Sequence, residues 1–368
     1  MEFSVSERTR LLLSARDRII LPPNVDTTAI LASHNLQFGL GRLLYAVRAI
    51  VSNAEVHFTA SVDFTVTRSP TRWGSGFSYG GLLELSTPGT RVVAPEIRPN
   101  TCGVLVGALT SHMSNEELVE RIVSVSSKFA PGTWDYSRRN HFVNVYRSQA
   151  TGQQIFLLHG CPEFLRADQQ DRPGLYPEHS AYWRSRLHHV PTPLGDATLL
   201  LDGAAEEYWE TYQHSDALSK RHRMSTAAQI FGDFSVICNE THEGMASSSS
   251  YLLGCHRARD VDTLYPLMTT LGQPSYLVSG DPAGSTALLL PHGTGYTFTF
   301  LPGECDVRCA ANGSVLFVFA GEAGETQVFR DFTNVPFVYR DSTLVEQWER
   351  DGVLTIRDVL VPLIFTKV

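Results

Sequence analysis

The chain has 368 residues, of which 43% are hydrophobic and 18% are charged. This composition is typical of a globular protein and excludes a chain that is disordered throughout. The net charge of -8 argues against a non-specific nucleic-acid binder, because such proteins are usually basic. Any contact with RNA would therefore depend on local basic patches, at residues 138–139, 184–189 and 220–223.

In chain order, apolar periodicity predicts strands at 56–67 and 102–109, a helix at 114–128, strands at 141–146 and 154–159, a long helix at 203–231, strands at 276–279, 287–290 and 315–320, and a short helix at 344–351. Many strands with a few helices indicate an α+β fold. No shift in composition marks a linker, so we expect a single domain over residues 1–368.

The sequence contains no run of about 18 apolar residues, which a membrane-spanning helix would need. The N-terminal segment Met1-Glu2-Phe3-Ser4 lacks the basic region of a secretory signal. The six cysteines show no regular spacing, so we expect reduced thiols. Together these features predict a cytoplasmic or other intracellular protein that is neither secreted nor bound to a membrane.

Five short polar segments lie at the ends of predicted strands, and each holds a Cys or His beside Asn or Gly. They are 99–103, 139–142, 158–160, 238–242 and 291–295. Thiolate and imidazole are ligands of borderline divalent metals such as zinc, and imidazole also binds manganese. These residues alone indicate a Cys/His metal site, and a purely structural role for them stays open.

The order and spacing of these segments resemble RtcB, a family of GTP-dependent ligases that join RNA ends. The family's motifs are similar, in chain order, to Asn100-Thr101-Cys102-Gly103-Val104, Asn140-His141-Phe142-Val143, His159-Gly160-Cys161, Cys238-Asn239, His256-Arg257, 279–285, His292-Gly293-Thr294-Gly295, Tyr339-Arg340-Asp341 and 362–367. The resemblance covers residues 91–368, whereas residues 1–90 form a divergent N-terminal part that resembles nothing recognisable.

The resemblance implies one large fold with a β-rich core and a deep cleft for metal and nucleotide. It implies Mn²⁺, as one or two ions, held by Cys102, His141, His159 and Cys238. His292 would be the nucleophile that attacks the α-phosphate of GTP and forms a covalent histidine–GMP adduct. The nucleotide would be bound by Asn140, Ser285, His292, Tyr339 and Lys367. The implied partners are guanine nucleotide, RNA ends that carry a 3′-phosphate or 2′,3′-cyclic phosphate and a 5′-hydroxyl, and helper proteins.

The sequence also departs from the family's pattern. Pro99 stands where the family has an aspartate, so the carboxylate that would help to hold a second metal ion is missing at this position. Cys238 stands where the family has a histidine, and His242 is an alternative ligand four residues later. Tyr296 and Glu163 stand where the family has arginines, and each such loss can cost several kcal/mol of transition-state stabilisation. Two alternatives to an active ligase therefore stay open: a degenerate paralogue that binds RNA, nucleotide or protein, and another Cys/His metal-dependent hydrolase.

Overall fold

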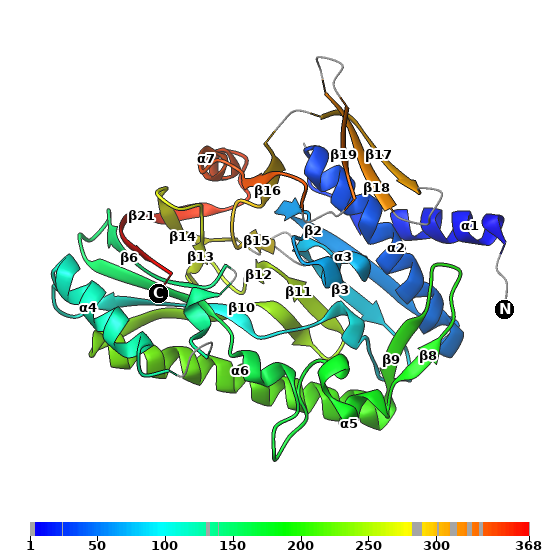
Figure 1. The fold of residues 1–368 in the computed structure, drawn as a ribbon, viewed down its shortest axis with the longest axis horizontal. Coiled ribbons are helices and arrows are strands. Elements are labelled where there is room, and N and C mark those ends of the chain that lie inside the picture. Colours follow the sequence, from blue (N-terminus) through cyan, green and yellow to red (C-terminus); the bar gives the residue numbers. More distant parts are fainter. Residues whose placement is uncertain are drawn as a thin grey trace.

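One mixed sheet of 11 strands dominates the described part of the chain in the computed structural model (Figure 1). The structure describes residues 4–23, 25–129, 133–138, 140–281, 289–299, 302–309, 315–321, 326–330 and 334–367. From edge to edge, the strands are β1 (Ile19–Ile20), β2 (Glu55–Thr65), β3 (Tyr79–Ser86), β11 (Ser250–Leu253), β10 (Phe234–Ser247), β5 (Cys102–Leu109), β7 (Gln154–Gly160), β6 (Phe142–Ser148), β21 (Thr355–Thr366), β14 (Ser275–Ser279) and β13 (Tyr265–Leu267). Only the pairing of β1 with β2 is parallel within this sheet.

Smaller sheets and helices surround this sheet. The smaller sheets are β12 (Cys255–Arg257) with β15 (Leu289–Pro291), β16 (Tyr296–Phe298) with β20 (Phe337–Tyr339), β17 (Pro302–Cys309) with β18 (Val315–Gly321) and β19 (Thr326–Phe329), and β4 (Val92–Val93) with β9 (Ala197–Leu201) and β8 (His188–Val190). The helices are α1 (Val5–Arg16), α2 (Thr27–Ile50), α3 (Pro70–Gly74), α4 (Asn115–Ser126), α5 (Ala181–Arg184), α6 (Asp202–Phe231) and α7 (Thr343–Arg350).

Two helices cover different parts of the sheet. α2 packs against β2 through fully buried side chains such as Leu36, Leu40 and Leu43. α6 runs the length of the molecule and, with α4, packs on β5, β6 and β7 (Figure 1). The helix α6 contacts β5, β7 and β10 directly, and it therefore holds in place the strand ends that carry the polar segments.

The expected α+β fold is confirmed, and most of the predicted elements are present. β2, β5, β6, β7, β14 and β18 correspond to predicted strands, and α4, α6 and α7 correspond to the predicted helices. Part of the predicted strand at 287–290 lies outside the described residues, and β15 begins at Leu289. The two helices α1 and α2 were not predicted. The sequence of α2 nevertheless carries a signal, because its buried Leu36, Leu40, Leu43 and Val47 recur at helical spacing.

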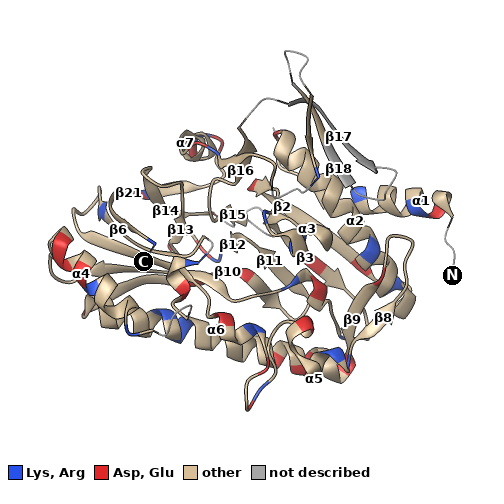
Figure 2. Cartoon of the chain, viewed as in Figure 1, with Lys and Arg blue, Asp and Glu red and all other residues tan. Residues whose placement is uncertain are grey.

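The basic patches offer less free charge than their sequence suggests. Acidic residues occupy the first half of α6 and basic residues the second half, and both signs are visible along this helix in Figure 2. Within 220–223, Lys220 pairs with Asp216 at 3.0 Å and Arg223 is fully buried.

None of the helices in the described part of the chain combines the length and apolar character that a membrane span requires.

Arg340, directly after β20, joins four segments that are far apart in the sequence. Its guanidinium donates to both carboxylate oxygens of Asp26 at 2.9 Å. It also donates to the backbone carbonyls of Asp63 at 3.3 Å, Phe64 at 3.1 Å and Thr294 at 3.1 Å. Arg340 therefore fastens the start of α2 and the end of β2 to the loop that carries His292.

We expect Arg340→Ala to lower the free energy of unfolding by about 3 kcal/mol, because it leaves a carboxylate and several buried carbonyls without a donor. Urea denaturation followed by circular dichroism measures this loss. The exposed Arg350 at the end of α7 offers a matched control, for which Arg350→Ala should change stability by less than about 0.5 kcal/mol. Equal effects of the two substitutions would contradict the assigned role of Arg340.

Candidate active site

Neighbouring strand ends bring sulfur and nitrogen side chains together in the middle of the sheet. The register sets His159 of β7 between Val104 of β5 and Phe142 of β6. Cys102 begins β5, and His141 directly precedes β6, so both lie beside His159. All three side chains are buried.

His242 enters the same cluster through a β-bulge. The pairing of β10 with β5 joins Thr241 to Gly103 and Glu243 to Cys102, so His242 is an extra residue between two pairs. Bulges redirect a side chain and are frequent beside functional sites. The His242 imidazole is buried, and its Nε2 lies 3.3 Å from Nε2 of His159.

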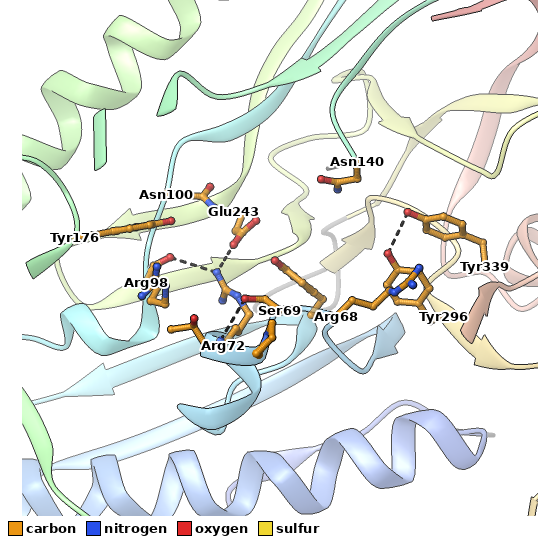
Figure 3. Close-up of a pocket in the computed structure, with 13 residues that line it drawn as sticks. Arg68, Ser69, Arg72, Arg98, Asn100, Asn140, Tyr176, Glu243, Tyr296 and Tyr339 are labelled. Atoms are coloured by element: carbon orange, nitrogen blue, oxygen red, sulfur yellow. Dashed lines mark hydrogen bonds and ion pairs between the residues drawn. The ribbon is translucent and has the colours of Figure 1, made fainter. Parts of the chain in front are cut away.

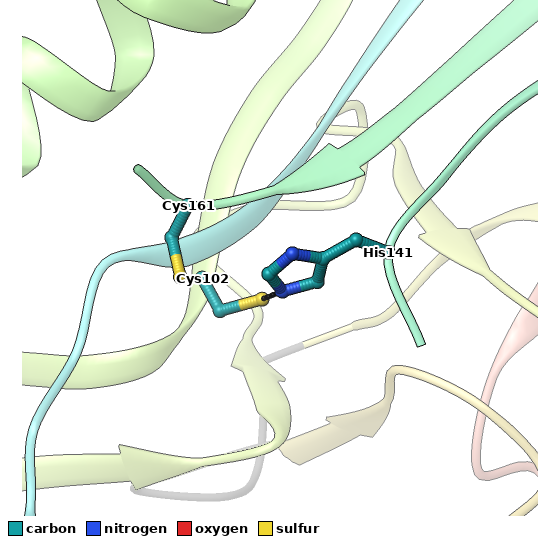
Figure 4. Close-up of side chains that lie close together, drawn as sticks. All are labelled: Cys102, His141 and Cys161. Carbon is teal, nitrogen blue, oxygen red and sulfur yellow. Dashed lines mark hydrogen bonds between the residues drawn. The ribbon is translucent and has the colours of Figure 1, made fainter. Parts of the chain in front are cut away.

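The spacing of these atoms suits a metal ion. Cys102 Sγ lies 3.2 Å from His159 Nε2 and 3.4 Å from His141 Nε2. A tetrahedral zinc ion with ordinary bond lengths would separate its sulfur and nitrogen ligands by roughly 3.3–3.8 Å. Two groups of three residues have all their ligand atoms within 4.8 Å of one another. They are Cys102 with His159 and His242, and Cys102 with His141 and Cys161 (Figure 4).

Hydrogen bonds at the far side of two imidazoles fix which nitrogen faces Cys102. The Nδ1 of His159 lies 3.0 Å from the carbonyl oxygen of Asn140, which can only accept, so Nδ1 carries the proton. The Nδ1 of His141 lies 3.0 Å from Oδ1 of Asp135. In both rings the Nε2 lone pair therefore points toward the cluster when the ring is neutral. This carboxylate or carbonyl support behind a histidine is typical of metal ligands.

Burial and neighbouring charges set the protonation of the cluster. Burial, followed by the adjacent histidines, lowers the pKa of His159 and His242 well below the ordinary value, which keeps these imidazoles neutral. Burial also lowers the pKa of His141, but hydrogen bonds with Asp135 and Cys161 outweigh it and raise this pKa to about 10. The hydrogen bond between the two thiols raises the pKa of Cys102 well above its ordinary value and lowers that of Cys161. A metal bound at His141 would displace its proton.

His292 lies beside this cluster and outside both groups. Its Nδ1 is 2.9 Å from Oδ2 of Asp63, and its backbone N–H donates to the same oxygen at 3.3 Å. The Asp63 side chain is 1% exposed and the His292 side chain is 19% exposed. The carboxylate accepts from Nδ1, so Nε2 is the ring nitrogen that faces away from Asp63. The ring centre lies 4.9 Å from that of His242.

A pocket of about 580 Å³ adjoins the cluster (Figure 3). Three of its lining residues are close in sequence to the cluster: Asn100 precedes Cys102 by two positions, Asn140 precedes His141 and Glu243 follows His242. The volume falls within the range of roughly 300–1,000 Å³ that is typical of small-molecule sites. The pocket is therefore large enough for a nucleotide beside the cluster.

Three arginines line this pocket, and two of them are already paired. Arg72 forms an ion pair with Glu243, and Arg98 forms one with Glu178. Arg68 pairs with no carboxylate that the structure describes. Its guanidinium carbon lies 5.9 Å from the centre of the Tyr296 ring, which stacks on Tyr339 with ring centres 4.7 Å apart. Arg68 is therefore the cation that is best placed to bind an anion in the pocket.

The structure brings together most of the residues that the sequence singled out. Cys102, His141 and His159 lie in the cluster, with His292 beside it. Asn140 and Tyr339 line the pocket. Lys367 follows β21, whose Thr366 pairs with Val143, so the last described residue lies near His141 although it does not line the pocket. Ser285 lies outside the described residues.

The structure does not bring Cys238 to the cluster. Cys238 pairs with Val106, four residues along β5 from Cys102, and packs in an apolar group with Leu157 and Leu277. Four residues of strand span about 13 Å, so Cys238 and His242 cannot both reach one metal ion. Burial raises the pKa of the Cys238 thiol to about 12. His242, the alternative in the sequence, takes the place expected for Cys238.

Several residues of the site were not found from the sequence. Asp63 and Arg68 come from the divergent N-terminal part, and no motif marks them. Asp135 lies in a short 3₁₀ segment six residues before His141. Cys161 was noted only as part of a motif, although its place directly after a strand that carries His159 is a signal that could have marked it as a ligand.

No protein-family model matches this sequence, and no curated protein matches it significantly. The family resemblance therefore rests on the motifs alone, and the geometry of the site is the independent support for any function.

We expect His242→Ala to lose the ion held with Cys102 and His159, and Cys238→Ala to keep all of the bound metal, because only His242 contacts the other residues of the cluster. Elemental analysis of the purified variants after zinc loading and desalting measures the ions per chain. Cys102→Ala should remove all of the bound metal, since both groups share its sulfur. A loss of metal in Cys238→Ala, with metal retained in His242→Ala, would reverse the assignment.

Proposed function

We propose that this protein is a metal- and GTP-dependent RNA ligase that resembles the RtcB family and uses His292 as its nucleophile. The observation that carries the proposal is the Asp63–His292 pair, which lies beside a buried Cys/His cluster, and a pocket of nucleotide size adjoins the same cluster. A neutral imidazole with one nitrogen held by a carboxylate is a competent nucleophile near pH 7.

In the first step, Nε2 of His292 attacks the α-phosphorus of GTP. A phosphorus–nitrogen bond forms, the bond from the α-phosphorus to the β-phosphate oxygen breaks, and pyrophosphate leaves. Asp63 holds the Nδ1 proton during the attack and stabilises the positive charge that develops on the ring. A metal bound at the cluster would neutralise charge on the phosphate oxygens.

Two further transfers complete the proposed reaction. An oxygen of an RNA 3′-phosphate attacks the guanylate, the phosphorus–nitrogen bond breaks, and His292 is restored. The 5′-hydroxyl of the second RNA end then attacks the activated 3′-phosphorus, and GMP leaves. The stacked Tyr296 and Tyr339 offer an aromatic surface for the base, and Arg68 offers a positive charge for the phosphates.

The RNA must reach a protein whose net charge is negative. Binding that depends on a few cations beside one pocket suits recognition of RNA ends better than binding along a duplex, because the latter requires many phosphate contacts. The substrate class that fits the proposal is therefore RNA with free ends, such as a cleaved tRNA-like molecule.

We expect labelled GTP to leave an acid-labile, base-stable phosphoramidate on the protein when Mn²⁺ or Zn²⁺ is present. His292→Ala should abolish the label, because it removes the attacking nitrogen. Asp63→Asn should slow labelling by roughly 100-fold or more, since the amide cannot hold the required tautomer in the same way. Denaturing gels with a labelled α-phosphate measure both effects.

The exposed His112 provides a control, and His112→Ala should be labelled like the unmodified protein. Metal binding without any label would contradict the proposal. That result would favour a metal-dependent hydrolase or a degenerate paralogue that binds RNA, nucleotide or protein.

Arg68→Ala should weaken GTP binding by roughly 10-fold to 100-fold, because a charge-assisted hydrogen bond contributes about 1.5–3 kcal/mol. Isothermal titration calorimetry on the His292→Ala background measures binding without turnover. Arg8→Ala on the exposed surface of α1 is the matched control and should leave the dissociation constant unchanged. Equal affinity of the Arg68→Ala variant and the control would contradict the role of Arg68.

A further inference from the structure

The thiol of Cys161 lies beside two other side chains that can bind a metal ion, Cys102 and His141. Continuing the register of β5 and β7 by one residue beyond the Gly103–Gly160 pair sets Cys161 opposite Cys102. Its sulfur lies within 4.8 Å of both the Cys102 sulfur and a ring nitrogen of His141 (Figure 4). All three side chains are buried.

The backbone around Cys161 is shaped to hold this arrangement. A side chain on Gly160 would place its Cβ 2.4 Å from Oδ2 of Asp135, so only glycine lets β7 pass this carboxylate. The other oxygen of Asp135 orients His141 toward Cys102. Arg166 lies on the opposite side and donates to the Cys161 sulfur at 3.6 Å. The thiol is thus enclosed by the groups that would stabilise it as a thiolate ligand.

We propose that Cys161 is a metal ligand and that, with Cys102 and His141, it forms a position that prefers zinc-class ions to Mn²⁺. Two thiolates and one imidazole form a soft ligand set, which suits Zn²⁺ or Co²⁺, whereas Mn²⁺ suits oxygen ligands. Two cysteines and one histidine can hold zinc and leave a fourth position open. The two thiolates also cancel the charge of one divalent ion, which lowers the cost of its burial.

This position differs from the group formed by Cys102, His159 and His242, which has one sulfur and two nitrogens. Because Cys102 belongs to both groups, its sulfur can contact an ion in either of them. Cys161 supplies the third ligand atom of its group, beside the Cys102 sulfur and a ring nitrogen of His141. The inference rests on the cluster alone and does not depend on guanylylation of His292.

Titration of the metal-free full-length protein with Co²⁺ tests the inference, because thiolate-to-cobalt charge transfer reports the cobalt–sulfur bonds. We expect two equivalents of Co²⁺ to bind. Cys161→Ala should retain one equivalent and lose more than half of the charge-transfer intensity. Cys238→Ala removes a buried thiol outside the cluster and should change neither value.

Cys161→Asp adds a test that does not depend on loss of binding. An aspartate at this position should retain the second ion and shift the ratio of Mn²⁺ to Zn²⁺ affinities toward Mn²⁺ by at least tenfold, because a carboxylate is a hard ligand. Unchanged stoichiometry and intensity in a folded Cys161→Ala variant would overturn the inference, as would an unchanged affinity ratio in Cys161→Asp. A protein that binds both ions but takes no label from GTP would contradict only the proposed ligase function.

Discussion

The buried guanidinium of Arg223 is the constraint on which the cluster depends. It extends from α6 and donates to the carbonyls of Thr101 at 3.2 Å and Gly160 at 3.0 Å. These two carbonyls directly precede Cys102 and Cys161, so one side chain fixes the backbone of both thiols. Arg223 forms none of the ion pairs among the described residues, and its charge disfavours protonation of His159 and His242. A positive charge held here favours neutral imidazoles, which are the form that binds metal.

A second arginine, Arg340, fixes the backbone around His292 in a similar way. Arg340 holds the backbone of Asp63 on one side and that of Thr294 on the other, so the carboxylate and the His292 loop keep their relative positions. Arg223 fixes the backbone of the Cys/His cluster, and Arg340 fixes the loop that carries His292. Both rely on backbone carbonyls, which makes their geometry insensitive to most side-chain substitutions nearby.

The sequence allowed the class of fold and the sheet's central strands to be predicted, because β5, β6 and β7 are continuous apolar runs with polar ends. Three residues of the cluster, Cys102, His141 and His159, followed from those ends. The sequence favoured Cys238 over His242 because a bulge is not visible in the sequence, and the bulge is what turns His242 inward. Asp63 and Arg68 could not be predicted, since they reach the site only through the long-range pairing of β2 and the packing of α2.

Tyr296 and Glu163 stand where the family has arginines, and in the structure each lies beside another arginine. Tyr296, at one such position, lies under Arg68, so the divergent N-terminal part supplies a cation to the same pocket. Glu163, at the other, pairs with Arg138 and therefore adds little free negative charge. The substitutions alone thus do not separate an active ligase from a binding module. The Asp63–His292 pair is the better test, because only the ligase proposal requires this imidazole to attack a phosphate.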